Sequence, residues 1–192
     1  MAPSFFFIDP FGFKGVPFYL IEQILSIKKT EVFINFMVRD VKRFLESSRH
    51  RISMEDLYGV DDVKGILDER YNNINKEDAL LSFYRDRLHE GANVKYTFPF
   101  KVSMDKAQQT TYYLIHATNH AKGCELMKEI MYNTGTKGRF GYLGPVEGQA
   151  TLMQCSGDLC EFKKFLIYHF KGQTLSYISC TDKIPMNVTF YL

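Results

Sequence analysis

The sequence feature that most constrains the fold is the stretch FFFIDPFG at residues 5–12. Residues 5–8 are four consecutive apolar residues, too few for a helix and typical of a strand covered on both faces, as in a parallel sheet. Because such a strand has no place for a charge, Asp9 is expected where the strand ends. In open α/β sheets the carboxyl ends of the strands border the crevice in which ligands bind. The stretch therefore predicts that Asp9 opens onto a crevice.

The pattern that follows indicates an α/β fold. Residues 16–29 carry apolar residues at helical spacing behind Pro17, and residues 30–37 are β-branched and aromatic enough for a second buried strand. A strand, a helix and a strand in this order form a parallel pair by the right-handed crossover rule. The chain beyond is expected to form a helical insertion at 38–91, an antiparallel hairpin at 93–104 and 110–118, and an amphipathic helix at 122–132.

The composition is that of an ordinary globular protein, with 45% hydrophobic and 24% charged residues among 192. A formal net charge of +2 does not by itself indicate a nucleic acid or a membrane, so a binding surface would have to be a local patch. No apolar run approaches the roughly 18 residues that span a bilayer, and no signal-peptide pattern is present. We therefore expect a cytoplasmic protein with no membrane partner. The cysteines form no CxxC pair and are expected to be reduced and structural: Cys124, Cys155, Cys160 and Cys180.

A glycine-rich segment divides the sequence into two parts. Five glycines fall within GTKGRFGYLGPVEG, so residues 135–149 are interpreted as a linker after a first domain at 1–134. Residues 150–192 contain an amphipathic helix at 158–170 and further short elements. The aromatic and basic residues of the linker could interleave with single-stranded nucleic acid, although a plain linker or hairpin is the favoured interpretation: Lys137, Arg139, Phe140 and Tyr142.

Three blocks in order resemble the three-Cys-motif partner proteins (TcmP), a prokaryotic family: FFFIDPFGFKGVPFYLIEQIL, TEVFINFMVRDVKRFL and TYYLIHATNHAKGCELMKEIMY. The resemblance implies a methyltransferase-like Rossmann domain, followed by a winged-helix-like segment of which residues 150–192 resemble the opening helices. It also implies a three-Cys-motif, radical-type partner protein. Family members begin upstream with a glycine-rich turn that cradles S-adenosylmethionine. No such turn follows a predicted strand here, so the chain is expected to be a C-terminal fragment that begins at the fourth strand.

DPFG resembles the [DNS]PP[YFW] motif of methyltransferases that modify exocyclic amines, and is closer still to the DPFG of tRNA guanine amine methyltransferases. By this resemblance Asp9 and the Pro10 carbonyl accept hydrogen bonds from the amine, Phe11 stacks on the flipped base, and Gly12 lets the backbone turn beside the ligand. The alternative is structural: an N-cap aspartate before a proline turn at a junction between a strand and a helix.

Further candidates for substrate or nucleic-acid binding lie after two other predicted strands. Asn35 and Arg39 lie near the end of the second strand. A basic stretch there could meet phosphates, although a solvated helix surface is the favoured interpretation: Arg39, Lys42, Arg43, Arg49 and Arg51. Asn119 and His120 follow the strand at 110–118 and are expected on the side where a base could sit. His116 and His120 have the spacing of zinc helices, but the strand predicted through His116 argues against a metal site.

These observations lead to two hypotheses. The first is a TcmP-like fragment of an S-adenosylmethionine-dependent methyltransferase-like protein that acts on an exocyclic amine of a nucleobase. The alternative is a non-catalytic module with a degenerate methyltransferase fold that binds nucleic acid or a partner protein. In either case the exposed edge of the first strand, residues 5–8, would favour a homodimer when the chain is made by itself.

Overall fold

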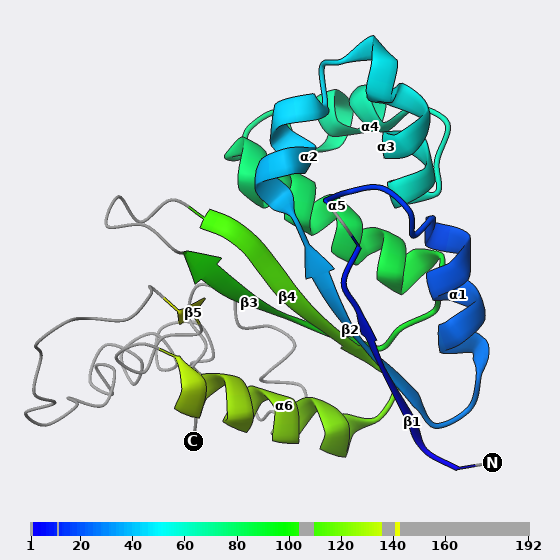
Figure 1. Cartoon of the computed structure of the whole chain (residues 1–192), viewed down its shortest axis with the longest axis vertical. Coiled ribbons are helices and arrows are strands. Elements are labelled where there is room, and N and C mark those ends of the chain that lie inside the picture. Colours follow the sequence, from blue (N-terminus) through cyan, green and yellow to red (C-terminus); the bar gives the residue numbers. More distant parts are fainter. Residues whose placement is uncertain (1, 11, 104–109, 136–140, 143–192) are drawn as a thin grey trace, which may run out of the picture.

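The computed structural model describes residues 2–10, 12–103, 110–135 and 141–142, and within them the chain has an α/β fold (Figure 1). The described strands form one mixed sheet in the order β1-β2-β4-β3-β5. The strands are β1 (Ser4–Ile8), β2 (Thr30–Phe36), β3 (Tyr96–Ser103), β4 (Thr110–Thr118) and β5 (Gly141–Tyr142). The helices are α1 (Phe18–Ser26), α2 (Val38–Phe44), α3 (Arg51–Tyr58), α4 (Val63–Arg70), α5 (Lys76–Glu90) and α6 (Ala121–Thr134), with a 3-10 turn at Ser48–His50.

The predicted parallel pair at the start of the chain is confirmed. β1 and β2 run in the same direction, with Ser4 opposite Thr30 and Ile8 opposite Ile34. α1 makes the crossover between them and buries Phe18 against the core. Side chains along β2 are alternately buried and half-buried, as expected for a strand that shows different environments to its two faces. The carboxyl ends of β1 and β2 therefore lie side by side at the same end of the sheet.

The predicted antiparallel hairpin is also confirmed, but β4 rather than β3 lies next to β2. Val32 of β2 pairs with Ala117 of β4, and Phe36 pairs with Tyr113. Because β4 runs opposite to β2, the residues that follow β4 lie at the other end of the sheet, where β1 and β2 begin. β5 pairs with β3 and falls within the expected linker, whereas the rest of 136–149 and the winged-helix-like segment at 150–192 lie outside the described residues.

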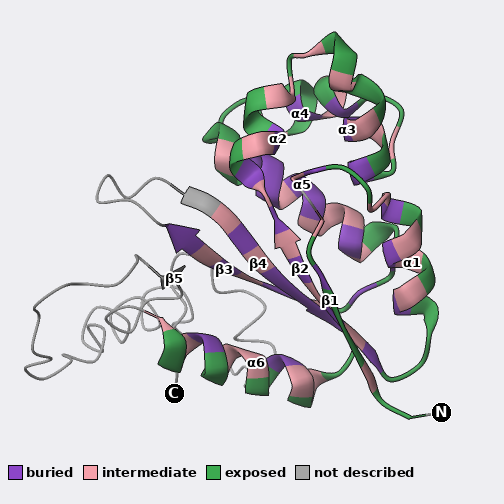
Figure 2. Cartoon of the chain, viewed as in Figure 1, coloured by how far each residue is buried: buried purple, intermediate pink, exposed green. Residues whose placement is uncertain are grey.

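Helices cover the sheet on both faces, but not evenly (Figure 2). On one face α1, α2 and α5 enclose a large core, in which the ring of Phe36 stacks on that of Tyr84 at 4.8 Å. On the other face α6 packs against β3 and β4, where Met131 joins Phe98 and Phe100 in a smaller cluster. The helical insertion predicted at 38–91 is confirmed as α2 to α5. α2, α3 and α4 lie beyond the carboxyl end of β2, at the top of Figure 1, whereas α5 runs back across one face of the sheet.

The expectation that residues 5–8 are covered on both faces is wrong for this chain. β1 is an edge strand of the described sheet, and α6 lies over β3 and β4 rather than over β1. Phe5 is 55% exposed and Phe7 is 59% exposed, although both rings lie within about 6 Å of the Phe33 ring. Among the described residues, nothing therefore covers β1 on its free edge and on this face.

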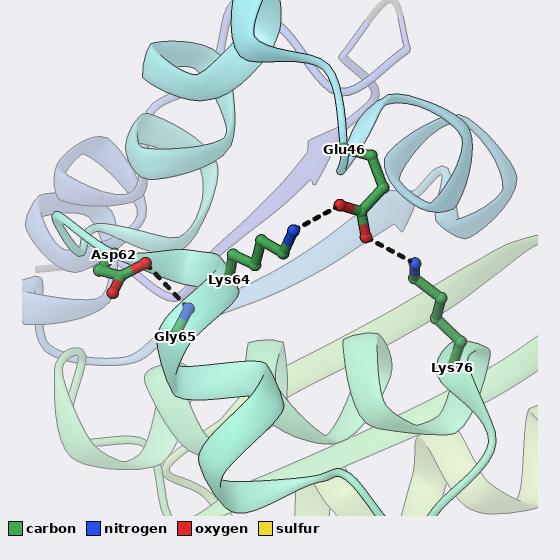
Figure 3. A network of polar contacts seen from close by, with 5 residues as sticks. All are labelled: Glu46, Asp62, Lys64, Gly65 and Lys76. Atoms are coloured by element: carbon green, nitrogen blue, oxygen red, sulfur yellow. Dashed lines mark hydrogen bonds and ion pairs between the residues drawn. The ribbon is translucent and has the colours of Figure 1, made fainter.

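The helical insertion is held together by caps and by an exposed polar network (Figure 3). Asp62 caps α4 by accepting a hydrogen bond from the backbone nitrogen of Gly65 at 2.8 Å. Glu46, which follows α2, accepts hydrogen bonds from Lys64 of α4 at 2.8 Å and from Lys76 of α5 at 3.1 Å. These two lysines lower the pKa of the Glu46 carboxyl. One side chain thus links three helices of the insertion.

A buried acid–imidazole pair fixes the start of α6 to the sheet. Nε2 of the fully buried His116 lies 2.7 Å from Oε2 of Glu31 on the neighbouring strand. Burial lowers the pKa of His116, and the Glu31 carboxylate offsets only part of that shift, so the neutral ring donates from Nε2. Gly123 of α6 packs on the same carboxylate, because a Cβ atom at this position would collide with Oε1 of Glu31.

We predict that Gly123→Ala destabilises the protein. The methyl group would displace the Glu31 carboxylate and leave the buried Nε2–H of His116 unpaired, at a cost of about 1–3 kcal/mol that exceeds the gain of about 1 kcal/mol in helix propensity. In a Glu31→Ala background nothing is displaced, so the same substitution should stabilise the protein. Urea unfolding of the four proteins measures both effects, and an equal effect in the two backgrounds would contradict this account.

Candidate functional site

Asp9 and Asn35 meet where the two parallel strands end. The register that pairs Ile8 with Ile34 places the next residue of each strand side by side on one face of the sheet. Nδ2 of Asn35 donates a hydrogen bond to Oδ1 of Asp9 at 2.7 Å. The carboxylate is thus held by a neutral amide rather than by a cation, and its other oxygen is free to accept a hydrogen bond from a ligand.

Asp9 opens onto a hollow, as the sequence predicts. The hollow has a volume of about 520 Å³, within the size range of small-molecule sites. Asp9 itself is exposed, and the N-cap residue of α1 is Pro17, so the alternative of a helix-capping aspartate does not hold. The described residues that line the hollow are Asp9, Pro10, Gly12, Phe13, Lys14, Asn35, Met37, Asp40 and Phe44.

The turn after β1 folds as a site for a close ligand would. Gly12 has φ +78°, a left-handed conformation that favours glycine over other residues. Pro10 also lines the hollow, beside Asp9. Phe11, expected as the stacking ring, lies outside the described residues.

Two other aromatic side chains form the apolar wall of the hollow. The rings of Phe13 and Phe44 lie 5.4 Å apart, and the imidazole of His50 packs on Phe44 at 4.6 Å and edge-on to Phe13 at 5.7 Å. Burial lowers the pKa of His50, and the nearby charges of Lys14 and Arg49 lower it further. His50 therefore adds aromatic surface and no positive charge beside the hollow at neutral pH.

Sequence reasoning missed Asp40, Lys14, Phe13, Phe44 and Met37. Phe13 and Lys14 line the hollow from the loop after β1, whereas Met37, Asp40 and Phe44 reach it because α2 starts directly after β2. A signal was available for Asp40, since it stands five residues after Asn35 in the first turn of a predicted helix. The other four residues looked like ordinary core or surface positions.

Arg39 and Arg43 both lie on α2, whose residues Met37, Asp40 and Phe44 line the hollow. Both arginines are exposed, and the guanidinium of Arg43 lies 5.2 Å from the centre of the Phe44 ring. Two other basic residues of the stretch are engaged elsewhere: Lys42 pairs with Glu77 and Arg51 pairs with Glu55. Arg39 and Arg43 are therefore exposed on the helix that borders the candidate site.

Asn119 and His120 lie at the opposite edge of the sheet from Asp9, so the expected position on the ligand side is wrong. β4 is antiparallel to β2, and five strand positions, roughly 17 Å, separate the level of Asn35 from that of Asn119. Oδ1 of Asn119 accepts a hydrogen bond from the backbone nitrogen of Lys95 at 2.8 Å, and His120 is the N-cap residue of α6. Asn119 and His120 therefore lie at the ends of secondary-structure elements: Asn119 binds the backbone just before β3, and His120 precedes α6.

One polar atom of the site is left unpaired. Oδ1 of Asn35 is buried and has no hydrogen-bond partner among the described residues, while Nδ2 of the same side chain is bound to Asp9. An unpaired buried acceptor costs free energy and is more common at functional positions than in ordinary core. The unpaired Oδ1 atom of Asn35 is therefore not explained by the stability of the sheet.

Across the described part of the chain, no three histidine, cysteine or acidic side chains cluster in a way that could hold a metal ion, and no helix is both long and apolar enough to cross a membrane. Comparison with known proteins found no matching family model, no matching curated protein and no matching solved structure.

We predict that Asn35→Asp destabilises the fold in a pH-dependent manner. A second carboxylate beside Asp9 replaces a hydrogen bond by a repulsion of about 1 kcal/mol at pH 7. Protonation of either group removes this repulsion, so the loss should shrink towards pH 4, near the ordinary pKa of an aspartic acid. Urea unfolding at both pH values measures the change. Asn35→Ala, which removes the hydrogen bond without adding a charge, is the control, and equal losses for both variants at both pH values would contradict the contact.

Proposed function

We propose that this chain is the C-terminal half of an S-adenosylmethionine-dependent methyltransferase-like protein, and that Asp9 binds the exocyclic amine of a nucleobase. The observation that carries the proposal is the Asp9 carboxylate, held by Asn35 at 2.7 Å and open to a hollow of about 520 Å³ at the carboxyl ends of a parallel pair. The free oxygen of Asp9 would accept one amine hydrogen. The lone pair of the amine would then face away from the carboxylate, as transfer of a methyl group to it requires.

The free edge of β1 supports the same proposal. In the strand order 3-2-1-4-5-6 of a doubly wound sheet, the first and fourth strands are neighbours, and ligands bind at the carboxyl ends where the order reverses. If β1 is the fourth strand, as the TcmP resemblance implies, a preceding strand would pair along its exposed edge. The elements that accompany that strand would then cover Phe5 and Phe7 on the open face. Asp9 would then stand at the switch point. Without that strand, the edge would be open to a homodimer contact.

The described residues would bind the substrate that receives the methyl group. They do not provide the part of the site that binds the cofactor. None of their strands is followed by a glycine-rich phosphate-type turn with an acid for a ribose, so we assign no residue of this chain to S-adenosylmethionine. What the chain contributes is binding and orientation: Asp9 holds the amine, Asn35 fixes Asp9, and the wall of Phe13 and Phe44 contacts an apolar ring. The three-Cys-motif partner protein stays part of the proposal through the resemblance alone.

A binding module without catalysis is the second candidate, because Arg39 and Arg43 are exposed on the helix beside the hollow. In that case the hollow would receive a base while the arginines contact phosphates, and no methyl group would be transferred.

We predict that Asp9→Ala abolishes methyl transfer by the product of the complete gene, a loss of about 100-fold or more, because the amine is no longer oriented. Transfer of labelled methyl groups from S-adenosylmethionine to RNA measures it. The matched control is Asp61→Ala, an exposed acid distant in sequence from the hollow. Methyl transfer that survives Asp9→Ala would contradict the enzymatic proposal. Weaker RNA binding by an Arg43→Glu, Arg49→Glu variant, with no transfer by the wild type, would favour the binding module.

A further inference from the structure

Arg85 of α5 carries a positive charge that no described residue neutralises. It is half-buried and forms no ion pair with another described residue. Burial lowers the pKa of its guanidinium, and the carboxylate of the neighbouring Asp86 offsets only part of that shift. Asp86 itself accepts a hydrogen bond from the hydroxyl of Tyr71. Because a partly desolvated charge without a partner costs free energy, an anion that reached Arg85 would repay this cost.

The connection between α5 and β3 holds the guanidinium in one orientation. The chain reverses direction after Glu90, so Thr97 of β3 lies beside Arg85. Nε of Arg85 donates to Oγ1 of Thr97 at 2.9 Å, and Nη2 donates to the carbonyl oxygen of the same residue at 3.3 Å. Both bonds use the edge of the guanidinium that carries Nε and Nη2. Nη1 and the second hydrogen of Nη2, which form the other edge, make no hydrogen bond to a described residue.

His89 fixes Thr97 in turn. Nδ1 of His89 lies 2.7 Å from the carbonyl oxygen of Val94, and Nε2 lies 3.0 Å from Oγ1 of Thr97. Since a carbonyl oxygen only accepts, Nδ1 carries the proton, and Nε2 of the neutral ring accepts from the Thr97 hydroxyl. The hydroxyl thus accepts a hydrogen bond from Arg85 and donates one to His89. This chain of bonds holds the guanidinium with its second edge unused.

Arg87, the next arginine of α5, provides an internal comparison. Its Nε and Nη2 donate to two backbone carbonyl oxygens at 2.8 and 3.4 Å, so the same edge is occupied. However, its guanidinium lies 5.1 Å from the centre of the Phe18 ring. Nη2 of Arg87 and Oε1 of Glu22 also lie 2.9 and 2.8 Å from the position that a Cβ atom of Gly91 would occupy. An aromatic ring and a carboxylate are therefore close to Arg87, and neither is found next to Arg85 among the described residues.

We propose that the unused edge of Arg85 is a binding site for a carboxylate group. The N–H groups of Nη1 and Nη2 on this edge are parallel, and the two oxygens of a carboxylate accept both of them in the bidentate geometry typical of arginine. The single charge of a carboxylate matches that of the guanidinium. A dianionic phosphate would instead place uncompensated negative charge near Asp86.

A ligand can approach this site from the edge of the sheet. Among the described strands, β5 pairs with β3 only at Lys101 and Val102, so no strand covers the backbone of β3 next to Thr97. Neither Arg85 nor Thr97 lines the hollow at Asp9. The inference is therefore independent of the proposed function, and the failure of one leaves the other intact.

Nitrogen-15 NMR spectra of the whole chain test the site directly in the wild type. Sodium acetate should shift the Nη and Nε signals of Arg85 in a saturable manner, because the carboxylate binds to this guanidinium. Sodium chloride at the same ionic strength should not do so. The signals of Arg85 are identified by their absence in Arg85→Lys. Arg85 signals that acetate moves no more than chloride does would overturn the proposal.

Arg85→Lys separates the bidentate geometry from the charge. Lysine keeps the positive charge but has no paired N–H groups, so acetate should bind at least about tenfold more weakly, as measured from the backbone amide signal of Thr97. Arg87→Lys is the matched control and should keep the wild-type affinity. Equal affinities of Arg85→Lys and the wild type would overturn the proposal. If Arg85→Lys does not fold, Thr97→Val, which removes the bond that orients Nε, should weaken acetate binding with the charge intact, and unchanged affinity would contradict the site.

Further probes identify the source of the carboxylate. An extended peptide with one glutamate among threonines and valines should bind more tightly than acetate if the carboxylate comes from a protein segment that pairs along the free part of β3. The same peptide with glutamine in place of glutamate measures the pairing alone. Equal affinities of the glutamate peptide and acetate would indicate a small carboxylate, and dependence on Arg85 is expected in both cases. Inorganic phosphate that binds Arg85 more tightly than acetate does would overturn the assignment to a carboxylate.

Discussion

The hydrogen bond from Asn35 to Asp9 is the contact on which the rest of the site depends. It exists because β1 and β2 are parallel and in a register that places Asp9, the residue after β1, beside Asn35 near the end of β2. A shift of one residue would turn Asn35 to the opposite face and leave Asp9 without its donor. The crossover through α1 fixes that register, so the fold and the chemistry of the hollow have a common origin.

The distribution of helices explains why this edge is open. α2 begins directly after β2 and brings Asp40 and Phe44 to one wall of the hollow, while α6 leaves β1 uncovered by lying over β3 and β4. Phe5 and Phe7 are therefore exposed on the strand that leads to Asp9. Under the proposed function, a further strand would pair with this edge and a ligand would enter the hollow next to it.

The helices and strands, and the position of Asp9 at the end of β1, could be predicted from the sequence because both depend on local patterns. Four apolar residues before an aspartate and a proline define a strand end, and the spacing of strand, helix and strand defines a parallel pair. The sequence was not sufficient for the place of Asn119 and His120, because their side of the sheet depends on β4 being antiparallel and inserted beside β2. The position of Asp40 in the first turn of a helix could be read from the sequence, but its approach to Gly12 comes from the path of α2, a tertiary feature that no local pattern records. The exposure of β1 depends on which elements pack beside it, and residues 5–8 alone could not predict it.

The most direct test of the account is a structure of the complete gene product with S-adenosylmethionine bound. We expect a strand from the preceding sequence to pair in parallel with β1, to bury Phe5 and Phe7, and to bring the methyl group of the cofactor to the hollow beside Asp9. A structure in which the edge of β1 is unpaired, or in which the methyl group lies away from the hollow that Asp9 and Asn35 border, would contradict it.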